Sequence, residues 1–130
     1  MSTYQTGSGA GQISLAADIT TVGLAASRAI TIDLNSQEPG KPVAHSDNAT
    51  GDIAQQQIGQ AGQLRGLRVS IVTKVEFWGS ADQRKAQYEA LSATYTLDGG
   101  SAGAKTYNDP KITVDEGYNV AILSKNIDMI

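Results

Sequence analysis

The segment Leu-Arg-Val-Ser-Ile-Val-Thr-Lys-Val-Glu-Phe, residues 67–77, decides the fold of this chain. Its odd positions are apolar or β-branched, whereas Arg68, Lys74 and Glu76 occupy even positions. Successive side chains of a β-strand point to opposite faces of a sheet. This period of two therefore predicts one long strand with its odd face turned toward a core.

Shorter alternating segments lie on both sides of this strand. Clusters of Gly, Pro, Asn and Asp separate them, so residues 35–51 are predicted to be a long surface loop and residues 98–103 a turn. Short strands between such turns are typical of an antiparallel sandwich or barrel rather than of a βαβ fold. The alternating apolar residues are Ile13, Leu15 and Ala17; Ile30, Ile32 and Leu34; Ile112 and Val114; and Tyr118, Val120 and Ile122.

Three segments allow more than one structure. Residues 19–29 contain Gly23 and fit a bulged strand or a short loop, and the Gln-rich residues 51–63 fit a loop or a frayed helix. Residues 80–83, Ser-Ala-Asp-Gln, have the pattern of a capping box, which favours a short helix near 81–91. The alternative for this last segment is the second strand of a long hairpin that begins near Lys85, because apolar residues alternate from Leu91 onward.

The length of 130 residues fits one domain. Residues 1–12 are rich in Gly and carry no charge, so they are predicted to form a flexible N-terminal arm. Residues 13–130 are predicted to form a single domain. The expected fold is mainly β, a single-domain antiparallel β-sandwich of the jelly-roll or Ig-like type with one short helix near 81–91.

Charge and composition exclude several classes of function. The net charge is −3 and the ten basic residues are scattered from Arg28 to Lys125, so nucleic acid is not an expected partner. The absence of cysteine excludes disulfides, thiolate metal sites and cysteine nucleophiles. No stretch approaches the roughly 18 apolar residues of a membrane span, and none has the pattern of a secretory signal. The expected location is a virion or an extracellular assembly, and otherwise the cytoplasm.

Candidate chemical groups do not converge. His45, Ser46 and Asp47 are consecutive, whereas a hydrolytic triad brings distant segments together. Residues 47–52 could offer several oxygens to a calcium ion, but the Gly and Glu of the EF-hand pattern are missing, which favours an ordinary turn. Adjacent Asp115 and Glu116 would point to opposite faces of a strand. We therefore expect a protein that is not an enzyme, with no cofactor, metal or catalytic residue.

The favoured function is that of a structural subunit that assembles with copies of itself, such as a phage or viral capsid, tail or decoration protein or a filament component. An uncharged arm can gain order by adding to the sheet edge of a neighbouring subunit. The alternative is a carbohydrate-binding or adhesive module, in which Trp78 and Tyr88 bind a glycan by stacking on its sugar rings. The residues expected to contact a neighbouring subunit are Tyr4, Gln5, Gln12 and Ile13.

Overall fold

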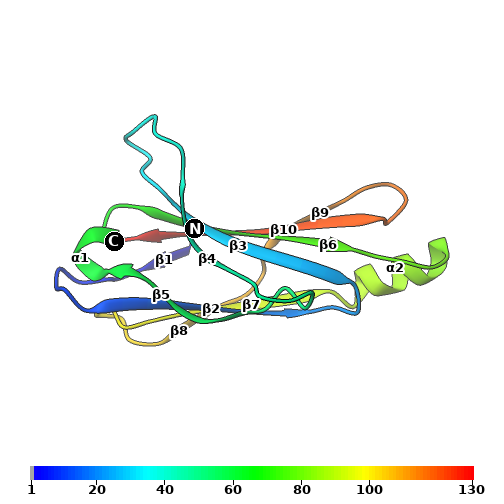
Figure 1. Ribbon diagram of the computed structural model, residues 1–130, viewed down its shortest axis with the longest axis horizontal. Helices are drawn as coiled ribbons and strands as arrows, with labels where there is room; N and C mark the ends of the chain where they lie inside the picture. The colour runs from blue at the N-terminus through cyan, green and yellow to red at the C-terminus, as the bar shows by residue number, and fades with distance from the viewer. Residues whose placement is uncertain (1) are drawn as a thin grey trace.

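Two β-sheets face each other in the computed structural model, which describes residues 2–130 (Figure 1). In sheet A the strand order is β1-β10-β6-β3-β4, and β9 pairs with the same edge of β10 as β1. Its strands are β1 (Ser2–Tyr4), β3 (Leu24–Ile32), β4 (Lys41–His45), β6 (Arg68–Glu76), β9 (Lys111–Val114) and β10 (Val120–Met129). All pairs are antiparallel except β1 with β10.

Sheet B has the order β5-β2-β7-β8 and is antiparallel throughout. Its strands are β2 (Gln12–Thr20), β5 (Ile53–Gln60), β7 (Ser92–Asp98) and β8 (Lys105–Tyr107). The two helices, α1 (Ala61–Leu64) and α2 (Ala81–Glu89), lie at opposite ends of the molecule (Figure 1). The structure thus confirms a mainly β, antiparallel sandwich.

The long strand predicted at 67–77 is β6, at the centre of sheet A. Val69, Ile71 and Val75 are completely buried, as their odd positions predict. Thr73 is buried as well, and its hydroxyl lies 2.6 Å from the hydroxyl of Ser27 on β3. Each hydroxyl therefore has a hydrogen-bond partner inside the core, which offsets the cost of burying it.

The helix predicted near 81–91 is α2, and the hairpin alternative is wrong. Ser80 and Gln83 form the capping box: the Gln83 backbone N–H donates to the Ser80 hydroxyl, and the Ser80 backbone N–H donates to the Gln83 side chain. None of the helical residues is buried. The alternation that begins at Leu91 belongs to β7, which starts at Ser92. Capping therefore fixes the start of this helix, and Tyr88 packs partly against the core.

Two predicted loops contain strands. Residues 51–63, predicted as a loop or frayed helix, form β5 and the short α1, and the loop at 35–51 includes β4. β5 pairs with β2 across irregular registers and buries Ile53 and Ile58, while its glutamines are exposed or half-buried. Pairing with a neighbouring strand overrides the weak strand propensity of this segment. Residues 19–29, for which the sequence allows either a bulged strand or a loop, form the end of β2, a turn around Gly23 and the first part of β3.

The inward face of β3 differs from the prediction. The alternation of the sequence predicts that Ile30 and Ile32 face the core. In the structure Ala29 and Thr31 are buried instead, and both isoleucines are half-buried. The register explains the inversion: Ala29 lies opposite the inward Ile71 of β6. Because directly opposite residues share a face of the sheet, Ile30 and Ile32 lie on the outer side.

Residues 2–6 do not form the free arm that the sequence predicts. β1 pairs with Ile127–Met129 of β10, and Tyr4 has no exposed surface. The Thr6 backbone N–H also donates to the Ile130 carbonyl at 3.0 Å. Met1, the first residue of the predicted arm, lies outside the described residues. The sandwich therefore includes part of the segment 1–12, which the sequence predicts to be an arm outside the domain at 13–130.

Tyr95 on β7 supplies a test of core packing. It has no exposed surface, and within residues 2–130 its hydroxyl has no hydrogen-bond partner. Removing an unsatisfied buried hydroxyl relieves a penalty of about 1 to 3 kcal/mol. We expect Tyr95→Phe to raise the free energy of unfolding by about 1 kcal/mol in urea denaturation at pH 7.

The same substitution changes the alkaline pH dependence. Burial raises the pKa of Tyr95 to about 12, and burial is also the main cause that raises the pKa of Tyr107 to about 12. In the unfolded chain a tyrosine hydroxyl ionises near pH 10. The stability that depends on keeping these two hydroxyls neutral is therefore fully present below pH 10 and is lost as the pH rises toward 12. Tyr95→Phe should flatten this loss. Tyr107→Phe should flatten the alkaline loss as well, but at pH 7 it is the control for the stabilisation, because it loses a 2.6 Å hydrogen bond to the Thr3 carbonyl. Equal stabilisation by both variants at pH 7 would contradict the prediction.

Candidate functional site

Two residues predicted to contact a neighbouring subunit lie in the core of their own chain. The Tyr4 hydroxyl donates to the Gly103 carbonyl at 2.6 Å and accepts from the Gly100 backbone N–H at 2.9 Å. Ile13, on β2, has no exposed surface. Tyr4 and Ile13 are therefore packed within their own chain and do not lie on its surface, and their role in subunit contacts stays a prediction.

The other two predicted contact residues are on the surface. Gln5 and Gln12 are both exposed. The backbone of Gln5 is held in place, since its carbonyl accepts from the Ala102 backbone N–H at 3.1 Å. The role of Gln5 and Gln12 in subunit contacts stays a prediction.

The aromatic residues Trp78 and Tyr88 are placed differently from each other. Tyr88 is half-buried and packs against Phe77, edge to face at 6.5 Å between ring centroids, and against Tyr118 at 5.4 Å. Trp78 is 52% exposed, and the Gln87 amide holds its backbone by donating to the Trp78 carbonyl at 2.9 Å. Tyr88 therefore contacts other aromatic rings of its own chain, whereas Trp78 is largely free, and glycan binding by Trp78 and Tyr88 stays a prediction.

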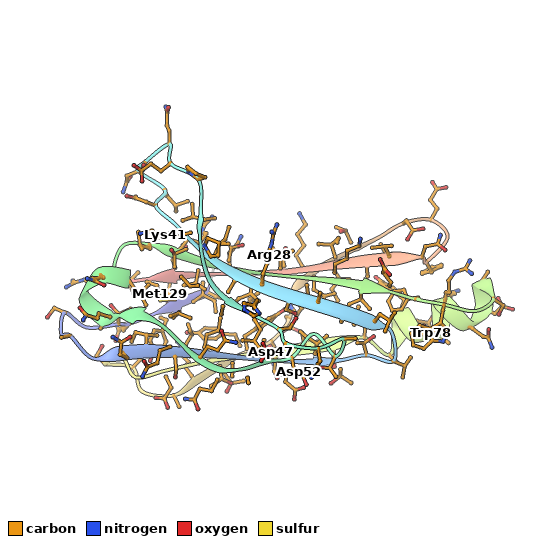
Figure 2. All side chains as sticks on the ribbon, viewed as in Figure 1. Arg28, Lys41, Asp47, Asp52, Trp78 and Met129 are labelled. Atoms are coloured by element: carbon orange, nitrogen blue, oxygen red, sulfur yellow. The ribbon has the colours of Figure 1, made fainter. Side chains whose placement is uncertain are left out.

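The polar loop between β4 and β5 is built as a turn. His45 Nδ1 lies 3.7 Å from an Asp47 oxygen, and both side chains are largely exposed. The Asn48 side-chain oxygen accepts from both the backbone N–H and the hydroxyl of Thr50, and Asp52 Oδ1 accepts from the Ile19 backbone N–H at 2.7 Å. Figure 2 shows Asp47 and Asp52 on this loop. Within residues 2–130 no group of three or more His, Asp or Glu side chains is gathered as a metal site.

Two carboxylates with lowered pKa values hold local structure. The hydrogen bond from Arg68 Nε to Asp128 Oδ1, at 2.7 Å, holds the pKa of Asp128 below its usual value. The pKa of Asp115 is lowered first by the Val120 backbone N–H and then by the Asn119 side chain. Both groups are stabilised as anions, the reverse of what a general acid near neutral pH requires.

The outer face of sheet A is the surface that stands out. Neither helix covers it in the part of the chain that the structure describes (Figure 1). Its apolar members are half-buried or exposed, and the central one, Val72, interrupts the polar positions of β6. Val72 is the sequence signal for this surface, because every other even position from 68 to 76 is polar. The apolar side chains that this face carries are Leu24, Ala26, Ile30, Ile32, Val72, Val120 and Ile122.

Basic residues accompany these apolar side chains. Arg28 projects from β3 on this side (Figure 2), opposite Val72 in the register, and takes part in no ion pair within residues 2–130. Lys111 on β9 is exposed and is likewise free of ion pairs in the same described range. Lys74 lies 3.5 Å from the exposed Glu76, a surface pair of little energetic weight. The outer face of sheet A thus combines aliphatic contact area with two cations, Arg28 and Lys111, that take part in no ion pair within residues 2–130.

One end of this face is hollowed. Leu24, Ala26 and Lys74 line a depression there together with Asn48 and Ala49 of the neighbouring loop. Leu24 is 51% exposed. The depression is open, and its lining is largely apolar.

Comparisons with protein-family models, with curated proteins and with solved structures give no match for this chain. None of the helices within residues 2–130 is long and apolar enough to cross a membrane.

Proposed function

We propose that this chain is a non-enzymatic structural subunit that assembles with copies of itself. Suitable settings are the capsid, tail or decoration layer of a phage or virus, or an extracellular filament. The supporting observation is the outer face of sheet A, on which aliphatic residues of three adjacent strands face solvent. The register sets polar residues of β6 between them, for example Glu76 between Leu24 and Val120, so the apolar side chains are interspersed with charged ones. Exposed apolar side chains gathered on one face of a folded domain, with polar residues around them, mark interaction sites.

The size of this face suits a protein partner. Strands β3, β6 and β10 have nine or ten residues each. At about 3.3 Å per residue and about 4.8 Å between strands, with β4 and β9 at the margins, the face spans about 30 by 20 Å. That area approaches the roughly 800 Å² that each partner buries in a standard interface.

The proposal places the main contact on the sheet and not on the arm. Tyr4 is occupied by its own chain, so donating β1 to a neighbour would cost its two hydrogen bonds and its burial. The sheet face needs no such rearrangement. It is available in the folded subunit, whereas the arm must first be released.

Light scattering coupled to size-exclusion chromatography tests the proposal. We expect the wild type to elute with a mass that is a concentration-dependent multiple of 13.6 kDa. The double variant Ile30→Gln/Ile122→Gln removes aliphatic contacts from two strands of the face and should return the protein to a monomer. Val22→Gln, in the β2–β3 turn, is the matched control and should assemble as the wild type does.

Two outcomes contradict the proposal. A wild type that stays monomeric at every soluble concentration removes self-assembly altogether. Assembly that persists in the folded double variant, with an unchanged circular dichroism spectrum and melting curve, would show that sheet A is not the contact surface.

A further inference from the structure

The outer face of sheet B differs in chemistry from that of sheet A. Its strands β2 and β7 present small and hydroxyl-bearing side chains together with Asp18 and Asp98. No basic residue occurs on β2 or β7. The outward residues of these two strands are Ser14, Ala16, Asp18, Thr20, Ser92, Thr94, Thr96 and Asp98.

We propose that the outer face of sheet A in one copy binds the outer face of sheet B in the next. This inference rests on the proposed function and assigns its geometry. Arg28 and Lys111 supply the free cations on one face, and Asp18 and Asp98 supply the anions on the other. Opposite charges at the two ends of an interface fix its register and exclude wrong pairings.

The spacing of these charges supports the match. Arg28 lies opposite Val72, Val72 opposite Ser124, and Ser124 opposite Lys111, so one row crosses four adjacent strands. Three strand spacings place the ends of this row about 14 Å apart. On sheet B, Asp98 lies opposite Ser14, and Ser14 is four residues from Asp18 on the neighbouring strand. Four residues along a strand and one strand across also give about 14 Å.

The centres of the two faces differ in side-chain size. Val72 stands in the middle of the row on sheet A. Between the two aspartates of sheet B lies the directly opposed pair Ala16 and Thr96, which line a shallow depression. In the proposed contact the aliphatic Val72 would lie against these small side chains, between the two ion pairs.

The arrangement has a defined symmetry. The line from Arg28 to Lys111 runs across the strands of sheet A, whereas the line from Asp18 to Asp98 runs mainly along the strands of sheet B. When these two lines are superposed, the strands of the two sheets cross at a steep angle, as in orthogonal sheet packing. The contact joins two different surfaces, and each copy keeps one of them free. Such a head-to-tail interface produces a closed ring or an open filament.

Charge reversal on each face tests the inference. In Arg28→Glu/Lys111→Glu both outer faces become acidic, and in Asp18→Lys/Asp98→Lys both become basic. Each variant alone should need at least a tenfold higher protein concentration than the wild type for half of the chains to assemble. An equimolar mixture should recover assembly, because each acidic face then meets a basic one. The single variant Asp18→Lys tests the same face without changing Asp98. Asp98 Oδ1 accepts a hydrogen bond from the Gly99 backbone N–H, so replacing Asp98 also removes a bond that holds the turn.

The outcomes separate this inference from the proposed function. If the wild type assembles and Ile30→Gln/Ile122→Gln prevents it, but the two charge variants behave as the wild type, self-assembly stands and the head-to-tail geometry is overturned. Folded charge variants that fail to assemble even when mixed also overturn it. A monomeric wild type removes the proposed function itself. Recovery only in the mixture, measured by light scattering, supports the inference.

Discussion

Replacing Tyr4 by alanine should lower the free energy of unfolding by about 3 to 5 kcal/mol, the range for truncating a large aromatic side chain in a core. Tyr4 has no exposed surface, and its hydroxyl bonds to Gly103 and Gly100. The substitution leaves a cavity and removes the hydrogen bonds by which the 99–103 loop holds β1. Urea denaturation at a concentration where the protein is monomeric measures the change.

Tyr4→Phe separates the two contributions. It keeps the ring in the core and removes only the hydroxyl, so we expect a loss of about 1 to 2 kcal/mol. If Tyr4→Ala unfolded within about 0.5 kcal/mol of the wild type, as surface substitutions do, the docking of β1 on β10 would be wrong.

The second large effect is expected at Gly99, in the turn that follows β7. Its φ of 99° lies in the left-handed region, and an added Cβ would collide with the Gln12 carbonyl oxygen. Backbone strain of about 1 to 3 kcal/mol adds to a steric cost of about 1 to 3 kcal/mol. We expect Gly99→Ala to destabilise the protein by about 4 kcal/mol in the same denaturation experiment.

Gly103 provides a control in the same loop. Its φ of 70° is also left-handed, but nothing lies within 4 Å of the position that a Cβ would occupy. Gly103→Ala should therefore cost only the conformational penalty of about 1 to 2 kcal/mol. Equal costs at both positions would show that Gln12 does not approach the turn so closely.

Sequence alone predicts the parts of this fold in which local pattern and tertiary pairing agree. β6 alternates without ambiguity, and the capping box of α2 is satisfied within four residues. Such signals depend only on neighbours in the chain, so they can be recognised without knowing which strand pairs with which.

The rest depends on pairings between distant residues. The phase of β3 follows from its register with β6, which no local pattern encodes because Ala29 is small and Ile30 is large. β5 becomes a strand through its partner β2, and β1 through residues more than one hundred positions away. The candidate surface was missed for the same reason, since Ile30 and Ile32 can be placed on it only once that register is known.

The parallel pairing of β1 with β10 also sets the order of events during synthesis. Ser2 lies opposite Ile127, so this edge of sheet A cannot close until nearly all of the described chain has left the ribosome. Pairings of such long sequence separation form slowly. Sheet A therefore lacks this edge until residues 127–129 have been made, and in the proposed assembly the contact between copies would have to wait for the same residues.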